Sequence, residues 1–518
     1  MINAPSRGEA SDALPSVAID QIIVTAAKGS GLKFFGILFA YVVRFVLGIL
    51  MARLMGAEQY GLYSLADATF YTSIGLAMLG LINALVRYIS MFASRRDEAS
   101  LWGTLQVGLG APFVVSVLAG AFLLVFAGPF ARLIFHEPRL VPVLRVAALA
   151  LPFGTLIATT AAALRGFNRI QYDVIAQDIS FPLLKLVVLI ALALTGLNAV
   201  KAMTAHAIGA VVSCVMLLYF LHKVFPLSRP WSAARRHAKE IFVFSAPLYA
   251  STLIVLFEGN LETFFLGALG AIASVGIFTV AARVNLAGKM FHQAVEAAAM
   301  PIVSELHSNG EHRQLGHFYQ SMTKWTFMSN VPLFLIVLLF SKPILSVFGE
   351  EFVAGSAALV ILSCGSLVNA ATGINGVVIP MTGNTWLNAV NTVITLAVKL
   401  TLGLLLIPSL GVVGAAITMA GTWSVLNLVR TLEIFLLLRL LPYNKSFVRP
   451  IVAGAVAAAA ALAMARWVFV ESNLVGTVLN IGCLMAVYVV MILVWGLSKE
   501  DRILLARLRG RLKVMLPG

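Results

Sequence analysis

The sequence predicts an all-α membrane protein that crosses the bilayer about fourteen times. Its 518 residues are 60% hydrophobic and only 11% charged, whereas a soluble globular protein carries roughly 25% charged residues. Apolar windows of about 20 residues, the length of one helical crossing, recur along almost the whole chain. The loops between them are too short to hold a folded soluble domain. This composition excludes a soluble enzyme and a disordered chain, because both need far more polar sequence.

Each expected crossing is a continuous apolar run between polar or turn-forming residues. The longest stretches between crossings are residues 223–240 and 303–322. The crossings are expected at residues 30–52, 62–86, 102–127, 141–164, 177–195, 200–222, 241–266, 275–302, 323–340, 355–379, 386–407, 411–437, 449–468 and 474–497.

Lysine and arginine concentrate in alternate loops, which explains most of the formal net charge of +15. Because cationic loops stay in the cytoplasm, we expect both termini on the cytoplasmic side of a bacterial inner membrane. Residues 1–29 are expected to form a cytosolic tail. Residues 499–518 alternate cations with leucines, which is typical of an amphipathic helix on anionic membrane lipids. The charge therefore marks topology, and no nucleic-acid partner is expected.

The two halves of the chain resemble each other at an offset of about 215 residues. The matching segments are Gly61–Ala66 with Gly276–Ala281, Lys185-Leu186 with Lys399-Leu400, and Gly196 with Gly411. Each repeat has six crossings, an even number, so the chain returns to its starting side and both copies have the same orientation in the membrane. We expect two pseudo-symmetric six-helix lobes facing a central cavity, with alternating access by rocking of the lobes. The expected units are an N-lobe (30–226), a basic linker (227–240), a C-lobe (241–440) and two extra C-terminal helices (441–498).

The junction after the first crossing carries a family resemblance. Residues 52–63 read ARLMGAEQYGLY, which resembles the AR-x-LG-x-x-x-YG-x-Y junction of the polysaccharide transporters, the Wzx-type oligosaccharide flippases. These transporters belong to the multidrug/oligosaccharidyl-lipid/polysaccharide exporter superfamily. Met55 stands where that family usually has leucine. Residues 241–248, IFVFSAPL, resemble the start of the family's second lobe.

The resemblance implies a transporter and not an enzyme. Its expected substrate is an undecaprenyl-pyrophosphate-linked oligosaccharide, moved from the inner to the outer leaflet for surface polysaccharide synthesis. Polysaccharide polymerases and glycosyltransferases are the implied protein partners. Two alternatives stay open: a multidrug or cation antiporter of the same superfamily, and a lipid II flippase. The short loops disfavour a membrane polymerase or ligase, which needs a large external loop.

Four cations fall near the middle of expected crossings, where an unpaired charge costs several kcal/mol. They are the candidate substrate-binding residues Arg44, Lys185, Lys289 and Lys399. Arginine and lysine suit the oxygens of a pyrophosphate, so one hypothesis is a cationic cavity between the lobes. The alternative is that acidic side chains neutralise these cations and merely join helices.

Five further ionisable residues are candidates for ion coupling or for structural ion pairs. Glu258 and Glu262 lie one helical turn apart and could bind a proton or Na⁺ that drives transport, or pair with Arg283. Asp67 is expected near Arg53. Glu296 shares a polar helical face with Asn285, Lys289 and His292, and such a face must meet protein or water. Neither a phosphate-binding loop nor a metal-ligand cluster is present in the sequence, so we expect no cofactor.

Overall fold

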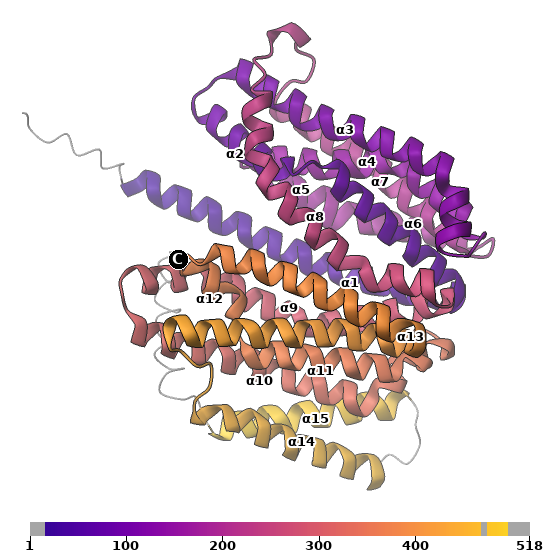
Figure 1. Ribbon diagram of the computed structural model, residues 1–518, viewed down its shortest axis with the longest axis vertical. Coiled ribbons are helices and arrows are strands. Elements are labelled where there is room, and N and C mark those ends of the chain that lie inside the picture. Colours follow the sequence, from indigo (N-terminus) through magenta and orange to yellow (C-terminus); the bar gives the residue numbers. More distant parts are fainter. Residues whose placement is uncertain (1–15, 468–473, 496–518) are drawn as a thin grey trace, which may run out of the picture.

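The computed structural model describes residues 16–467 and 474–495, and almost all of them are helical (Figure 1). Short π-helical turns at 130–134 and 174–180 extend α3 and precede α6, and 3₁₀ turns occur at 231–233, 350–355 and 445–447. The helices are α1 (Ser16–Ala77), α2 (Leu81–Ser94), α3 (Glu98–Pro129), α4 (Leu140–Gly166), α5 (Ile170–Asp173), α6 (Phe181–Ala193), α7 (Ala199–Val224), α8 (Ala238–Leu269), α9 (Ile272–Ser308), α10 (His312–Ser346), α11 (Ser356–Thr372), α12 (Asn375–Met381), α13 (Thr385–Leu438), α14 (Val448–Trp467) and α15 (Leu474–Trp495).

Eleven of the described helical stretches are long and apolar enough to cross a membrane. Two of them, Phe35–Ala77 and Trp386–Leu438, contain two crossings each, because Gly56 and Gly411 interrupt α1 and α13 with positive φ angles. Helix α9 supplies one more crossing through its apolar section Ile272–Leu286. The predicted all-α fold with about fourteen crossings is therefore confirmed.

Several predicted boundaries were wrong. Residues 16–29, which were expected to belong to a tail, are helical and continuous with α1. The expected second crossing breaks at Gly80, and the expected tenth breaks at Gly373; both glycines have positive φ. The expected loop 303–322 is mostly helical, because α9 and α10 extend beyond their apolar sections. Residues 1–15 and the basic tail 499–518 lie outside the described residues.

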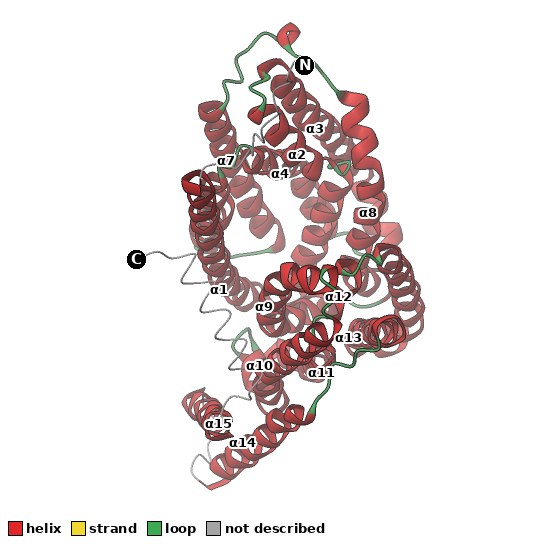
Figure 2. Cartoon of the chain, turned by 90° about the vertical axis from the view of Figure 1, so that its left-hand side faces the viewer, coloured by secondary structure: helices red, strands yellow, loops and turns green. Residues whose placement is uncertain are grey.

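The helices form two lobes with a pair of helices at one side. In both views α2, α3, α4 and α7 lie in the upper part, α9–α13 lie in the middle, and α14 and α15 lie at the lower edge (Figures 1 and 2). Helices α4 and α7 pack together in the first group and α11 and α13 in the second, while α14 and α15 pack on α10. Figure 1 shows α1 running between the lobes. The domain boundaries expected from the sequence stay a prediction.

The two lobes meet where the second half of α1 crosses α9. A Cβ atom on Gly61 would overlap the carbonyl oxygen of Ile272, and one on Gly276 would overlap the carbonyl oxygen of Ala57. Gly61 with Gly276, and Ala57 with Ile272, are each separated by 215 residues. The contact is thus made by equivalent residues of the repeat, and the pseudo-twofold axis passes through it.

A second contact closes the lobes at the end of the molecule where α1 is interrupted. The break at Gly56 leaves the backbone N–H of Ala57 without a helical partner, and this N–H donates to Oε2 of Glu351 at 2.8 Å. Nearby, Nε of Arg53 donates to the carbonyl oxygen of Val347 at 2.8 Å. A carboxylate at a helix N-terminus is favourable, because it satisfies free N–H groups and the helix dipole. Glu351 therefore caps a helix of the other lobe.

The close crossing predicts that Gly61→Ala destabilises the protein. The added methyl group meets backbone, which cannot rotate away, so we expect a loss of about 1–3 kcal/mol, measured as a lower melting temperature of the purified chain. Gly110→Ala is the control, since no atom lies within 4 Å of its added Cβ. Equal melting temperatures for the two variants would contradict the close approach of α1 and α9.

The cap predicts that Glu351→Ala opens the closed end. Loss of a helix cap costs about 0.5–2 kcal/mol, so the fraction of molecules with separated lobes should rise. Spin labels at the exposed positions Leu133 and Leu410, on different lobes, measure this separation after replacement of the native cysteines. Glu350→Ala removes the neighbouring carboxylate and should leave the distance distribution unchanged.

Candidate functional site

A cavity of about 680 Å³ lies on the N-lobe side of the lobe interface. Helices α1, α6, α7 and α9 line it, so one wall comes from the second half of the chain. It runs along α1 from Met51 to Leu38. Its polar lining consists of Tyr41, Arg44, Tyr63, Asp67, Tyr71, Lys185, His206 and Arg283.

Three cations from three helices line this cavity. Arg44 comes from α1 and is exposed, while Lys185 comes from α6 and is only 9% exposed. Arg283 comes from α9, in the second half of the chain. Its guanidinium occupies the space that a Cβ on Gly48 would need, one helical turn beyond Arg44. Glycine at this position therefore admits an arginine from the other lobe.

Among the cavity residues whose side chains the structure describes, Asp67 is the single carboxylate beside these cations. It accepts a hydrogen bond from the Tyr63 hydroxyl at 3.1 Å, and the same hydroxyl accepts one from Nζ of Lys185 at 2.6 Å. Nδ1 of His206 lies 3.5 Å from Asp67 and 3.4 Å from Nζ of Lys185. With three cations against one carboxylate, the cavity wall has a positive excess.

The expected pairing of Asp67 with Arg53 is not found. Arg53 turns toward the backbone of Val347, because the break at Gly56 separates the two residues by a change in helix direction. Asp67 instead contacts Tyr63 on its own helix and His206 on α7. Helical periodicity did not identify these neighbours.

Lys399, the repeat equivalent of Lys185, does not line this cavity. Its Nζ lies 2.9 Å from Oε1 of Glu262 and donates to the backbone carbonyl of Glu258 at 2.6 Å. Lys399 and Glu262 are 3% and 2% exposed. Pairing of these glutamates with Arg283, one of the two alternatives for them, is not found, because Arg283 lines the N-lobe cavity.

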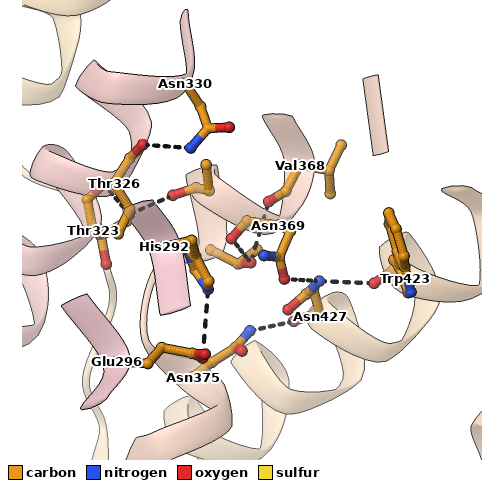
Figure 3. Close-up of polar contacts among 12 residues, drawn as sticks. His292, Glu296, Thr323, Thr326, Asn330, Val368, Asn369, Asn375, Trp423 and Asn427 are labelled. Atoms are coloured by element: carbon orange, nitrogen blue, oxygen red, sulfur yellow. Dashed lines mark hydrogen bonds and ion pairs between the residues drawn. The ribbon is translucent and has the colours of Figure 1, made fainter. Parts of the chain in front are cut away.

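Lys289 also lies outside the cavity. Its ammonium sits over the ring of Trp423, 3.1 Å from the ring centroid, which is a cation–π contact. Glu296, which shares its helical face, lies 3.4 Å from Nε2 of His292 instead (Figure 3). The polar face of α9 meets protein in the C-lobe, as the sequence required.

Asparagines complete this polar region of the C-lobe (Figure 3). Asn375 donates to the carbonyl oxygen of Asn427 at 3.1 Å, and Asn427 donates to the side-chain oxygen of Asn369 at 2.9 Å. These bonds join α11 and α12 to α13. These hydrogen bonds stabilise helix packing, because each joins two different helices inside the protein.

Several cavity residues were not singled out from the sequence as site residues. Tyr63 and Tyr71 flank Asp67 at spacings of four residues, so all three share one face of α1. This polar and aromatic face was a usable signal. His206 was harder to recognise, because it is isolated on α7 and its aromatic neighbours Phe70, Tyr71 and Phe181 come from other helices.

The Tyr63 hydroxyl is expected to hold the cavity wall together. Tyr63→Phe removes the acceptor for Lys185 and the donor to Asp67, which leaves each of them only its longer contact with His206, at a cost of about 1–3 kcal/mol. Thermal melting of the purified chain should show the loss. Tyr219→Phe is the control, since Tyr219 is 61% exposed. A melting temperature equal to that of the control would contradict this role.

Two family models match the chain. The model described as "Polysaccharide biosynthesis protein" matches residues 26–307, more than half of the chain, and the MatE model matches residues 247–413. The first covers the whole N-lobe cavity, including Arg283.

Individual proteins show the same likeness. The probable low-salt glycan biosynthesis flippase Agl15 of Haloferax volcanii is 29% identical over 191 residues, which are 37% of this chain and 40% of that protein. Stage V sporulation protein B of Bacillus subtilis is 23% identical over 502 residues, covering 90% of this chain and 95% of that protein. The structure of the lipid II flippase MurJ in an inward closed conformation has a TM-score of 0.72 at 13% identity, covering 90% of this chain and 98% of that one. The last match shows a shared fold.

Proposed function

This chain belongs to the polysaccharide biosynthesis protein family, within the multidrug/oligosaccharidyl-lipid/polysaccharide exporter superfamily, and we propose that it is a flippase for lipid-linked oligosaccharides. Its substrate carries the glycan on undecaprenyl pyrophosphate, and the protein transfers it across the bacterial inner membrane for surface polysaccharide synthesis. Membrane glycosyltransferases supply such a substrate, and a polysaccharide polymerase consumes it.

The positive excess in the N-lobe cavity carries this proposal. A pyrophosphate diester bears two negative charges, which match three cations and one carboxylate. Arg44 and Arg283 offer planar donor groups for phosphate oxygens, and Lys185 offers a point charge. Because Arg283 belongs to α9 and Arg44 to α1, a bound pyrophosphate would contact both lobes. Binding would therefore be linked to their relative position.

The shape of the cavity supports loading from the cytoplasmic side. The lobes are held together near Gly56, and the cavity extends away from that end along α1 toward Leu38. The basic loops at 95–96, 165–169 and 223–239 connect helices at the end opposite to Gly56, and cationic loops lie in the cytoplasm. Alternating access would then open the Gly56 end and release the glycan outside.

Two alternative functions from the same superfamily would require different charges in the cavity. A multidrug or cation antiporter, which the MatE match supports for residues 247–413, binds cationic substrates and would be disfavoured by the positive excess. A lipid II flippase carries the same pyrophosphate, and the MurJ fold supports it. The charge of the cavity therefore distinguishes the antiporter from the proposed flippase. The lipid II flippase differs from the proposed flippase only in the glycan that the substrate carries.

Neutralising a cavity cation should stop export. We expect Arg44→Gln and Arg283→Gln each to weaken pyrophosphate binding about 10- to 100-fold, the effect of losing a charged hydrogen bond worth about 1.5–3 kcal/mol. The assay is surface polysaccharide in a strain lacking its own flippase, with protein levels checked by immunoblot. Lys342→Gln is the control, since Lys342 is exposed and lies outside the cavity. Normal export by both arginine variants would refute the proposal.

The same variants separate the alternatives. Rescue of a lipid II flippase depletion, without rescue of surface polysaccharide, would favour the lipid II substrate. Increased resistance to cationic drugs that survives Arg44→Gln would favour the antiporter.

A further inference from the structure

The buried ion pair in the C-lobe holds an ammonium against two oxygens of a neighbouring helix. The ammonium of Lys399 lies between Oε1 of Glu262, at 2.9 Å, and the carbonyl oxygen of Glu258, at 2.6 Å. Both oxygens come from one turn of α8, whereas Lys399 comes from α13. A carboxylate and a backbone carbonyl are also the oxygen ligands that bind small hard cations.

The positive charge at this position is required by burial. Glu262 is 2% exposed and Lys399 is 3% exposed, so an ionised glutamate there must have a counter-charge close by. The chain supplies the counter-charge itself, on a side chain of the neighbouring helix. The position is therefore filled by the protein's own ammonium.

Lys185, the corresponding lysine of the N-lobe, has different contacts. Lys185 donates to the Tyr63 hydroxyl and lines the cavity, whereas Lys399 is closed off between α8 and α13. The repeat thus keeps a lysine at both positions, but only one of them faces the space where a substrate binds.

We propose that Lys399 is a tethered cation, which occupies with its own ammonium a position between α8 and α13 that would otherwise bind a monovalent metal ion such as Na⁺. The Glu262 carboxylate and the Glu258 carbonyl consequently take up no cation from solution in the natural protein, and transport is not driven through them. Removing the ammonium turns the position into a cation site. This inference goes beyond the proposed function and does not depend on what the N-lobe cavity carries.

The test compares salts rather than activities. The full-length chain and its Lys399→Ala variant are purified in detergent and melted in NaCl, KCl, LiCl or choline chloride at equal ionic strength. The natural protein should melt at the same temperature in all four salts. Lys399→Ala should melt at a lower temperature in choline chloride and regain about 2 °C or more in the presence of a metal cation that fits, in a saturable manner.

A double variant identifies the ligand. Lys399→Ala combined with Glu262→Gln has neither the ammonium nor the carboxylate, so its melting temperature should not respond to the metal cation. If Lys399→Ala folds only in NaCl and unfolds on dialysis into choline chloride, the proposal is supported in its strongest form. If it fails to fold in every salt, or melts identically in all of them, the proposal is wrong.

One further outcome would overturn the proposal that Lys399 is a tethered cation. A Na⁺-specific rise in the melting temperature of the natural protein that disappears in Glu262→Gln would show that the glutamates bind a cation with Lys399 in place. None of these measurements involves substrate, so failure of the export prediction for Arg44 and Arg283 would leave this result unaffected, and the reverse also holds.

Discussion

The close crossing of α1 and α9 is the contact on which the arrangement of both lobes depends. Backbone meets backbone there because Gly61 and Gly276 have no side chains, and the same residues of the two repeats make the contact from both sides. Close packing through small residues is how membrane helices associate without a hydrophobic driving force between them. From this point α1 leads into the N-lobe cavity, while α9 places Arg283 in the same cavity and Lys289 in the C-lobe. One helix crossing therefore sets the position of charge in both lobes.

The lobes share a fold but differ in how they hold charge. On the N-lobe side, Arg44, Lys185 and the α9 residue Arg283 face a cavity whose described lining holds a single carboxylate, Asp67. In the C-lobe, Glu262 neutralises Lys399, and Lys289 rests on Trp423. The two repeats have equivalent helices, but the excess positive charge lies on the N-lobe side of the pseudo-twofold axis. An anionic substrate would then be bound mainly by one lobe, with Arg283 as the contribution of the other.

Sequence patterns predicted the fold well and the site only in part. Apolar run length located the crossings, and the repeat predicted two lobes before any contact was known. Depth in the membrane selected Arg44 and Lys185, which do line the cavity. The same criterion also selected Lys289 and Lys399, because depth does not tell which neighbouring helix a side chain meets. The errors at Asp67 and Glu262 have this same origin, since Asp67 meets His206 and Glu262 meets Lys399, each more than 100 residues away along the chain.

The cap of Ala57 by Glu351 has a consequence for biogenesis. The two residues are 294 positions apart, so the donor enters the membrane long before its acceptor has been synthesised. At about 5–20 residues per second, the ribosome needs roughly 15–60 s to reach Glu351. During that interval the nascent N-lobe has an uncapped helix end and an unpartnered Gly61 face. The N-lobe therefore reaches its final form only when the second repeat has been inserted, and a translocon or chaperone has that long to act on it.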